Sequence, residues 1–301
     1  MDVRHGTRLC PVLGPGEAFE VMVRPRAVAV IGAGTDPLSP GGSIYARFKG
    51  LGVPVWPVNP GTGRIGGDAC FPSVAALPGT PDLAVIATRA DRVAEVAREC
   101  GTAGVKVAIS IAGGFAETGD AGRGLEEDLR KVVAETGIRL LGPNTLGVVA
   151  PHTGMDTIFV RHEEDVFSRA GEIALVTQSG SVGVEALGML AGYGTGIRVF
   201  IGLGNQADLD VADALEWLAG DDGTRVIALY LESAPEGRRM IDALSRCSAA
   251  GRPVVVLPAG RTEGGGAAAC SHTGRLASRG SIMHGAIAQA GAITADDDEH
   301  L

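Results

Sequence analysis

A histidine is the side chain of this sequence best suited to covalent chemistry. His272, one of six histidines, lies in 260–274, a run of small residues that begins and ends with glycine. Neutral imidazole is well populated near pH 7, so a histidine can act as a nucleophile. On so long a loop it is expected to move between two partners. A lone histidine is more often a surface or structural residue, and that alternative stays open at this point.

An acid at the end of an apolar run is the next candidate. Glu232 follows the run 227–231, which predicts a buried strand. Catalytic side chains of parallel sheets gather at the carboxyl ends of strands. A carboxylate there can accept a hydrogen bond from one imidazole nitrogen and leave the other nitrogen to attack. Taken alone, Glu232 would be a solvated surface charge.

Three small residues form a candidate anion site. Ser179, Gly180 and Ser181 stand between an apolar run and a stretch with helical spacing. Small residues at a helix start leave backbone N–H groups available, and the helix dipole adds about half a positive charge there. The pattern therefore predicts a phosphate cradle. An ordinary serine N-cap would look the same.

A glycine loop near the start of the chain is a candidate nucleotide site. Gly32, Ala33 and Gly34 follow the first apolar run, where backbone can approach a phosphate. A dinucleotide fingerprint needs a third glycine where Pro37 stands, and an acidic residue about 20 positions on, but the next strand ends in Asn59. The pattern disfavours NAD, and with it an NAD-dependent dehydrogenase. A plain turn remains an alternative.

A second polar turn ends the first half of the chain. Gly142, Pro143 and Asn144 follow the last apolar run there. At this edge of a sheet an asparagine side chain can pair with a ligand amide. The same three residue types are common turn formers, so both interpretations stay open.

The elements that position these residues read as two α/β units. Short runs rich in Val, Ile and Leu alternate with longer segments of helical spacing, which is typical of parallel sheets buried on both faces. The pattern predicts strands at 27–31, 53–58, 83–87, 105–111 and 139–141, then at 172–177, 197–203, 224–231 and 253–257. It predicts helices near 43–50, 91–103, 120–136, 181–192, 210–219, 235–250 and 279–290. The 301 residues therefore divide into domains at 1–150 and 151–301.

Composition limits the partners. The net charge of −9 and the absence of a Lys/Arg-rich block predict no nucleic-acid partner. The five cysteines contain no Cys-x-x-Cys pair, so we expect neither a disulfide framework nor a metal site. No signal peptide or apolar stretch of about 18 residues is present, which predicts a cytoplasmic protein without a membrane span.

The order of the motifs resembles one enzyme family. The resemblance covers about residues 23–293 and is carried by 30–37, Pro57-Val58-Asn59-Pro60, Gly142-Pro143-Asn144, Gln178-Ser179-Gly180, Gly204-Asn205-Gln206-Ala207-Asp208, Tyr230-Leu231-Glu232, Gly260-Arg261-Thr262 and Ser271-His272-Thr273-Gly274. In this order they look like the α subunit of ADP-forming acyl-CoA synthetases, which is related to the α subunit of succinyl-CoA synthetase.

The resemblance implies a fold and a chemistry. It implies a CoA-binding Rossmann-like domain, then a flavodoxin-like domain of the succinyl-CoA synthetase type. CoA would be held by Gly32, Ala33, Gly34, Asn59, Pro60 and Asn144. His272 would be phosphorylated, Glu232 would orient it, and Ser179, Gly180 and Ser181 would bind phosphate. ADP or ATP with Mg²⁺ would bind to an ATP-grasp β subunit, in a hetero-oligomer or a homodimer.

The chain departs from the family pattern at three places, and the departures at Pro258 and Arg275 favour a second hypothesis. The family commonly has Lys-Ser where this chain has Pro258-Ala259, and Ala-Val-Pro where it has Ala87-Thr88-Arg89. Arg275 puts a cation beside the expected nucleophile, where it would either assist phosphate binding or depress the pKa of His272. A module that binds CoA or acyl-CoA and regulates a partner, without phosphotransfer, is therefore the alternative to an enzyme. The acyl group is not specified by any motif.

Overall fold

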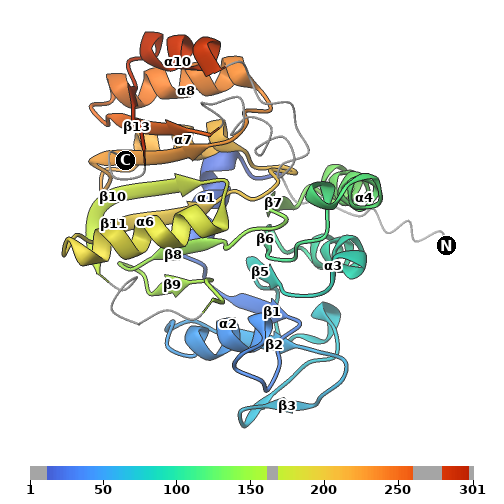
Figure 1. The fold of residues 1–301 in the computed structure, drawn as a ribbon. Coiled ribbons are helices and arrows are strands. Elements are labelled where there is room, and N and C mark those ends of the chain that lie inside the picture. Colours follow the sequence, from blue (N-terminus) through green and yellow to red (C-terminus); the bar gives the residue numbers. More distant parts are fainter. Residues whose placement is uncertain (1–11, 161–168, 260–279, 298–301) are drawn as a thin grey trace, which may run out of the picture.

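The first sheet is parallel throughout and buried at its centre. The computed structural model describes residues 12–160, 169–259 and 280–297 (Figure 1). The strands of the first sheet lie in the order β2 (Val55–Val58), β1 (Val28–Ile31), β5 (Leu83–Ile86), β6 (Val107–Ser110) and β7 (Arg139–Leu141). Every residue of β1, β5 and β6 is buried, which explains why their sequences are apolar without alternation.

Helices on both faces cover this sheet. They are α2 (Pro40–Phe48), α3 (Ala90–Thr102) and α4 (Asp120–Thr136), with the short turns η1 (Val74–Ala76) and η2 (Ala116–Thr118) and the hairpin β3 (Arg64–Ile65) and β4 (Asp68–Ala69). The sequence sets the start of α2, because the Ser39 hydroxyl accepts a hydrogen bond from the Gly42 N–H and Pro40 occupies the first turn.

The second sheet is mainly parallel with an antiparallel edge. Its order is β14 (Ile293–Thr294), β13 (Val254–Pro258), β12 (Val226–Leu231), β10 (Ala170–Thr177), β11 (Ile197–Gly202), β8 (Val148–Ala150) and β9 (Met155–Asp156). Both β8 and β9 run antiparallel to their neighbours. Helix α6 (Gly180–Gly192) covers one face, and α7 (Val211–Gly220), α8 (Gly237–Ala249) and α10 (Gly280–Gln289) pack on the core of the other face.

The helix α1 (Pro15–Val23) joins the two sheets. Its residues Ala18, Phe19, Met22 and Val23 are buried. The ring of Phe19 stacks on Trp217 of α7, with 5.4 Å between ring centroids. The same hydrophobic cluster contains residues of both sheets, so the two halves of the chain share one continuous core.

The structure confirms the predicted strands and helices within three residues at each end. It adds α1 and the short strands β3, β4, β8, β9 and β14, which the sequence pattern did not predict. The division near residue 150 stays a prediction; β8, which ends there, pairs with β11 of the second sheet. Within the described ranges, no helix is long and apolar enough to cross a membrane.

Candidate functional site

The glycine loop lies where ligands of open parallel sheets bind. The chain passes from β1 outward to β2 and returns to β5 on the other side of β1, so the strand order reverses at the β1 and β5 ends. Gly32 follows β1 with φ of 85°, and a Cβ there would overlap the carbonyl oxygen of Ala87 at the end of β5. Only glycine fits this position, because both the backbone angle and the space exclude a side chain.

The predicted residue Asn59 holds this loop in place. Its Nδ2 donates to the carbonyl oxygen of Ala33 at 2.7 Å, and its Oδ1 accepts from the Gly61 N–H at 2.8 Å. The structure therefore brings the loop 32–34 and the turn 59–60 together at one edge of the sheet. Binding of a ligand by these residues stays a prediction.

Asn144 lies farther along the same edge. It follows β7, three strand positions from β1, so the two loops are about 14 Å apart at the usual strand spacing. The residue has φ of 58°, an angle that asparagine tolerates better than most residues. Its Nδ2 donates to Oδ1 of Asn205 at 3.2 Å, and its N–H donates to the carbonyl oxygen of Ala112 at 2.8 Å.

The start of α6 occupies the corresponding position in the second sheet. The strand order reverses between β10 and β12, and Ser179 follows β10 as the N-cap of α6. The Ser179 and Ser181 hydroxyl oxygens are 3.1 Å apart, and the Thr177 hydroxyl accepts from the Ser179 N–H. The first turn of α6 contains no acidic side chain, so no carboxylate of this turn neutralises the positive end of the helix dipole.

Glu232 lies across the same reversal point, joined to it by a buried amide. Gln178 is 8% exposed; its Oε1 accepts from the N–H groups of Glu232 and Ser233 at 2.7 and 2.8 Å, and its Nε2 donates to the Ser233 carbonyl at 2.6 Å. The end of β12 is thereby fixed beside the start of α6. The sequence showed Gln178 only as part of a motif, although a polar residue at a buried strand end is itself a signal.

A phenol next to Glu232 stays protonated. Burial, and then the negative charge of Glu232, raise the pKa of Tyr230 to about 12. The predicted nucleophile His272 and the cation Arg275 lie outside the described residues. Strand β13 ends at Pro258, and the next N–H, of Ala259, donates to the carbonyl oxygen of Leu231 at 2.8 Å. The chain thus enters 260–279 from the strand beside Glu232.

The two sheets meet at this site through polar contacts that the sequence did not predict. Asn205, in the loop after β11, donates to Glu117 at 2.6 Å and to Glu126 at 2.9 Å. A Cβ on Gly180 would lie 3.3 Å from the side chain of Leu146, two residues after Asn144. The predicted turn after β7 and the predicted phosphate cradle are therefore neighbours.

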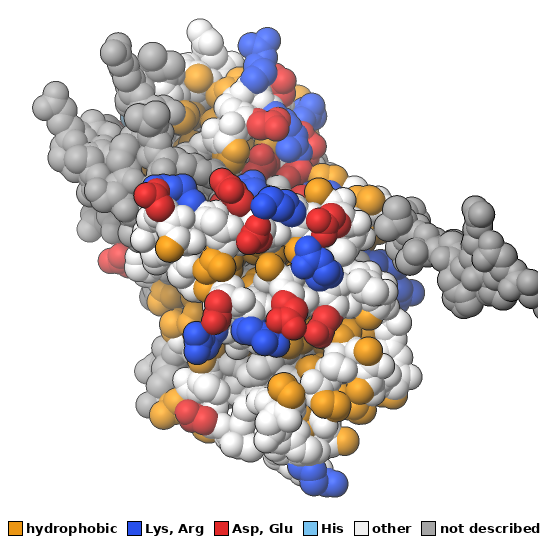
Figure 2. Space-filling model, turned by 90° about the vertical axis from the view of Figure 1, so that its right-hand side faces the viewer, with side chains coloured by type: hydrophobic (Ala, Val, Ile, Leu, Met, Phe, Trp, Pro, Cys, Tyr) orange, Lys and Arg blue, Asp and Glu red, His pale blue; other side chains and the backbone are white. Residues whose placement is uncertain are grey.

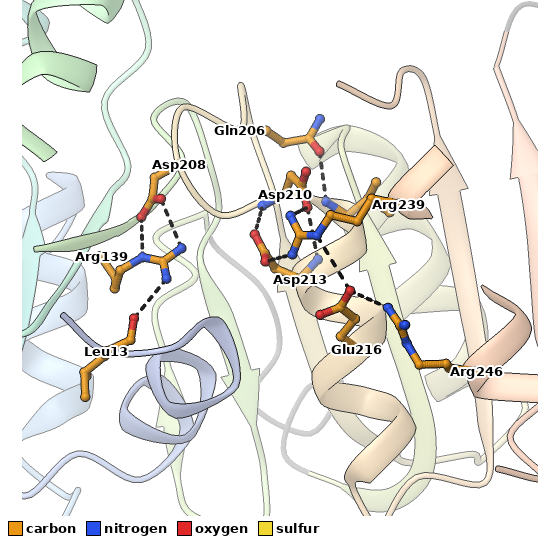
Figure 3. A network of polar contacts seen from close by, with 10 residues as sticks. Leu13, Arg139, Gln206, Asp208, Asp210, Asp213, Glu216, Arg239 and Arg246 are labelled. Atoms are coloured by element: carbon orange, nitrogen blue, oxygen red, sulfur yellow. Dashed lines mark hydrogen bonds and ion pairs between the residues drawn. The ribbon is translucent and has the colours of Figure 1, made fainter. Parts of the chain in front are cut away.

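Ion pairs hold the same loop farther from the site. Arg139 of β7 binds Asp208 through two hydrogen bonds and also donates to the Leu13 carbonyl oxygen (Figure 3). Next to this pair, Arg239 of α8 contacts Asp210 and Asp213 at the start of α7 (Figure 3).

Charges of both signs are interspersed on one face of the molecule. On the face drawn in Figure 2, acidic and basic side chains lie beside one another, with small apolar areas between them. Within the parts of the chain that the structure describes, no group of three His, Cys, Asp or Glu side chains is placed to hold a metal ion.

Comparison with known proteins identifies both halves. A model of the CoA binding domain family matches residues 26–151, and a model of the succinyl-CoA ligase like flavodoxin domain matches residues 170–301. The alpha subunit of acetate–CoA ligase [ADP-forming] II of Pyrococcus furiosus is 36% identical over 284 residues, which make up 94% of this chain and 61% of that protein. The chain thus combines these two domain types and resembles an ADP-forming acetate–CoA ligase alpha subunit over nearly its whole length.

Other relatives show how far the likeness extends. The 4-hydroxybutyrate–CoA ligase [ADP-forming] of Nitrosopumilus maritimus is 32% identical over 287 residues, 93% of this chain and 40% of that protein. The acetyl-coenzyme A synthetase 1 of Ca. Korarchaeum cryptofilum, solved in complex with phosphate and ADP, superposes with a TM-score of 0.87 at 38% identity. That alignment covers 93% of this chain and 60% of the other. The chain thus spans about three fifths or less of these acyl-CoA synthetases.

Proposed function

We propose that this chain is the CoA-binding part of an ADP-forming acyl-CoA synthetase, which interconverts acyl-CoA, ADP and phosphate with acid, CoA and ATP. The observation that supports this most is the position of Gln178, which fixes Glu232 beside the start of α6, where the helix dipole favours an anion. An acid and an anion site thus meet where the chain leaves for 260–279, the segment that carries His272.

The reaction divides into two transfers before the nucleotide. A phosphate oxygen attacks the thioester carbonyl, the C–S bond breaks, and CoA leaves as the thiolate with an acyl phosphate as product. An imidazole nitrogen of His272 then attacks phosphorus, and the P–O bond to the acyl group breaks to release the carboxylate. In this scheme Glu232 accepts a hydrogen bond from the second imidazole nitrogen, and the N–H groups of 179–181 hold the phosphoryl oxygens.

The phosphoryl group passes in the last step from phosphohistidine to ADP. The nucleotide and Mg²⁺ would bind on an ATP-grasp β subunit, in a hetero-oligomer or a dimer of such units. One observation supports a partner: the Pyrococcus furiosus relative is named as an alpha subunit. The CoA site would extend from 32–34 and 59–60 to Asn144 along the carboxyl edge of the first sheet.

Intact mass spectrometry tests the proposal. The purified chain is incubated with phosphate, Mg²⁺ and a panel of acyl-CoAs, alone and with a candidate β subunit. We expect one acid-labile phosphoryl group on the wild-type chain and none on His272→Ala. His284→Gln, a change at a histidine of α10, is the matched control and should be phosphorylated normally.

The alternative of a CoA-sensing module gives a different result. Wild type and His272→Ala would then both bind CoA, and neither would gain mass even with the β subunit present. That result would refute phosphotransfer and leave CoA binding standing.

A further inference from the structure

A partly buried polar cluster joins the turn at Asn144 to the second sheet. Asn205 lies at its centre: its Oδ1 accepts from Asn144, and its Nδ2 donates to Glu117 of η2 and Glu126 of α4. Glu126 is 5% exposed and pairs with Arg130 at 2.9 Å. These contacts come from four different segments: the turn after β7, η2 and α4 in the first half of the chain, and the loop after β11 in the second.

The two carboxylates determine which way the Asn205 amide points. Burial raises the pKa of Glu117, but hydrogen bonds from Asn205 and from the Gly114 and Phe115 N–H groups outweigh burial, so that the pKa is lowered overall. An ionised carboxylate only accepts hydrogen bonds, so the amide nitrogen of Asn205 must face the two acids. Its carbonyl oxygen must then face Asn144.

The orientation of Asn205 in turn sets that of Asn144. Because Asn205 offers an acceptor, Asn144 turns its Nδ2 toward Asn205 and its Oδ1 to the other side. A Cβ placed on Gly113 would lie 3.1 Å from this Oδ1. Gly113 is exposed at the carboxyl edge of the sheet, so the oxygen is displayed where a ligand of the first domain would pass.

We propose that Asn205 is a positioning residue that fixes the polarity of Asn144, so that Asn144 accepts a hydrogen bond from an N–H or O–H group of CoA. The inference rests on the proposed function, because it takes CoA to be the ligand at this turn. It adds that Asn144 acts through its carbonyl oxygen, and that a residue of the flavodoxin-like domain controls recognition by the CoA-binding domain.

The substitution Asn205→Asp distinguishes a role of Asn205 in orienting Asn144 from a role in packing alone. The charged groups that face position 205 are Glu117, Glu126 and Arg130, while Asp208 farther along the loop is paired with Arg139. A third carboxyl among two acids and one cation has a raised pKa, because like charges disfavour ionisation. When protonated, it donates its O–H to one glutamate and accepts from Asn144, as the native amide does. When ionised, it repels both glutamates, and the hydrogen bonds that orient Asn144 are lost.

Calorimetric titration of CoA into the full chain is the experiment. At about pH 8, Asn205→Asp should bind CoA at least about tenfold more weakly than wild type at the same pH, and at about pH 5.5 within about threefold of it. Asn205→Ala has no titrating group and should be weakened by the same factor at both values. Near-ultraviolet circular dichroism confirms that each variant is folded before titration.

A double variant supplies the missing hydrogen-bond donor from an amide, so that the carboxyl at position 205 need not be protonated. In Asn205→Asp with Glu126→Gln, the new amide at 126 can donate to the carboxylate at 205, whose other oxygen accepts from Asn144. This variant should recover CoA affinity at about pH 8 to within about threefold of wild type. It also provides the test if the single variant is unfolded at that pH.

Two results would overturn the inference. One is Asn205→Asp binding CoA like wild type at about pH 8, and the other is equal weakening of Asn205→Asp and Asn205→Ala at every pH without recovery in the double variant. A wild-type chain that binds no CoA at either pH would instead refute the proposed function, and the inference would fall with it.

Discussion

Removing Arg139 tests how the two sheets are held together. Its guanidinium donates to Asp208 at 2.9 and 3.1 Å and to the Leu13 carbonyl at 3.0 Å. The two charged side chains are only 13% and 16% exposed. Asp208 also accepts from the Leu140 N–H. In Arg139→Met the aliphatic volume remains, but a nearly buried carboxylate keeps one hydrogen-bond donor out of three.

The expected loss follows from this burial. Breaking a buried ion pair by removing one partner costs about 3–5 kcal/mol, and we expect a value near the lower limit because both side chains retain some exposure. Arg98→Met is the matched control: Arg98 pairs with Glu135 across α3 and α4, but these side chains are 51% and 57% exposed. Its cost should be below about 1 kcal/mol.

Urea unfolding followed by tryptophan fluorescence measures both variants. The chain has two tryptophans, Trp56 in β2 and Trp217 in α7, so each sheet region contains one probe. Adding Asp208→Asn to Arg139→Met should recover part of the loss, because no unpaired charge then remains buried. A cost for Arg139→Met no greater than that of Arg98→Met would refute the reasoning.

Two further predictions concern stability. Gly122→Ala should destabilise the chain, because the new Cβ would overlap a backbone carbonyl oxygen. In the same helix, a Cβ at Gly124 meets nothing within 4 Å, so Gly124→Ala should stabilise the chain by about 1 kcal/mol. Urea unfolding of the two variants measures both effects. Burial raises the pKa of Asp221, but the Arg198 guanidinium outweighs burial and the pKa falls to about 2. The stabilisation is therefore complete above about pH 4 and lost as the pH falls toward 2. In thermal melts, the melting temperature of Asp221→Asn should therefore lack this fall with decreasing pH. The melting temperature of Asp222→Asn, a change at an exposed neighbour, should keep it.

The sequence predicted the sheets well because burial and composition agree there. Strands such as β1 and β6 are buried on both faces, so their apolar runs identify them without reference to the rest of the chain. Helix α1 was missed, since a segment of 9 residues between glycine and proline gives a weak periodic signal, and its stability comes from packing on Trp217. Strand β8 has three residues and exists because β11 pairs with it.

The candidate site was predictable only within each sheet. Residues such as Asn59 and Glu232 follow buried strands, and the rule that ligands gather at carboxyl ends predicts their edge. Gln178 and Asn205 act by bridging elements, and an amide in a sequence does not show which backbone or acid it will contact. The roles of Glu117 and Glu126 were invisible for the same reason, because helical surface acids look like solvated charges until a partner from the other sheet is placed against them.

The contact between the two sheets explains why two motifs, separated by about 60 residues, belong to one site. The N–H of Asn205 donates to the Pro143 carbonyl at 2.9 Å, and the N–H of Ala207 donates to that of Gly142 at 2.9 Å. A Cβ on Gly204 would overlap the Pro143 carbonyl oxygen. The loop can therefore approach the turn this closely only with glycine at position 204. The turn that ends β7 and the loop that ends β11 therefore form one rigid backbone unit. A ligand held at Asn144 has a fixed position relative to the start of α6, which is what an acyl group must have if it is to pass from a thiol to a phosphate without leaving the protein.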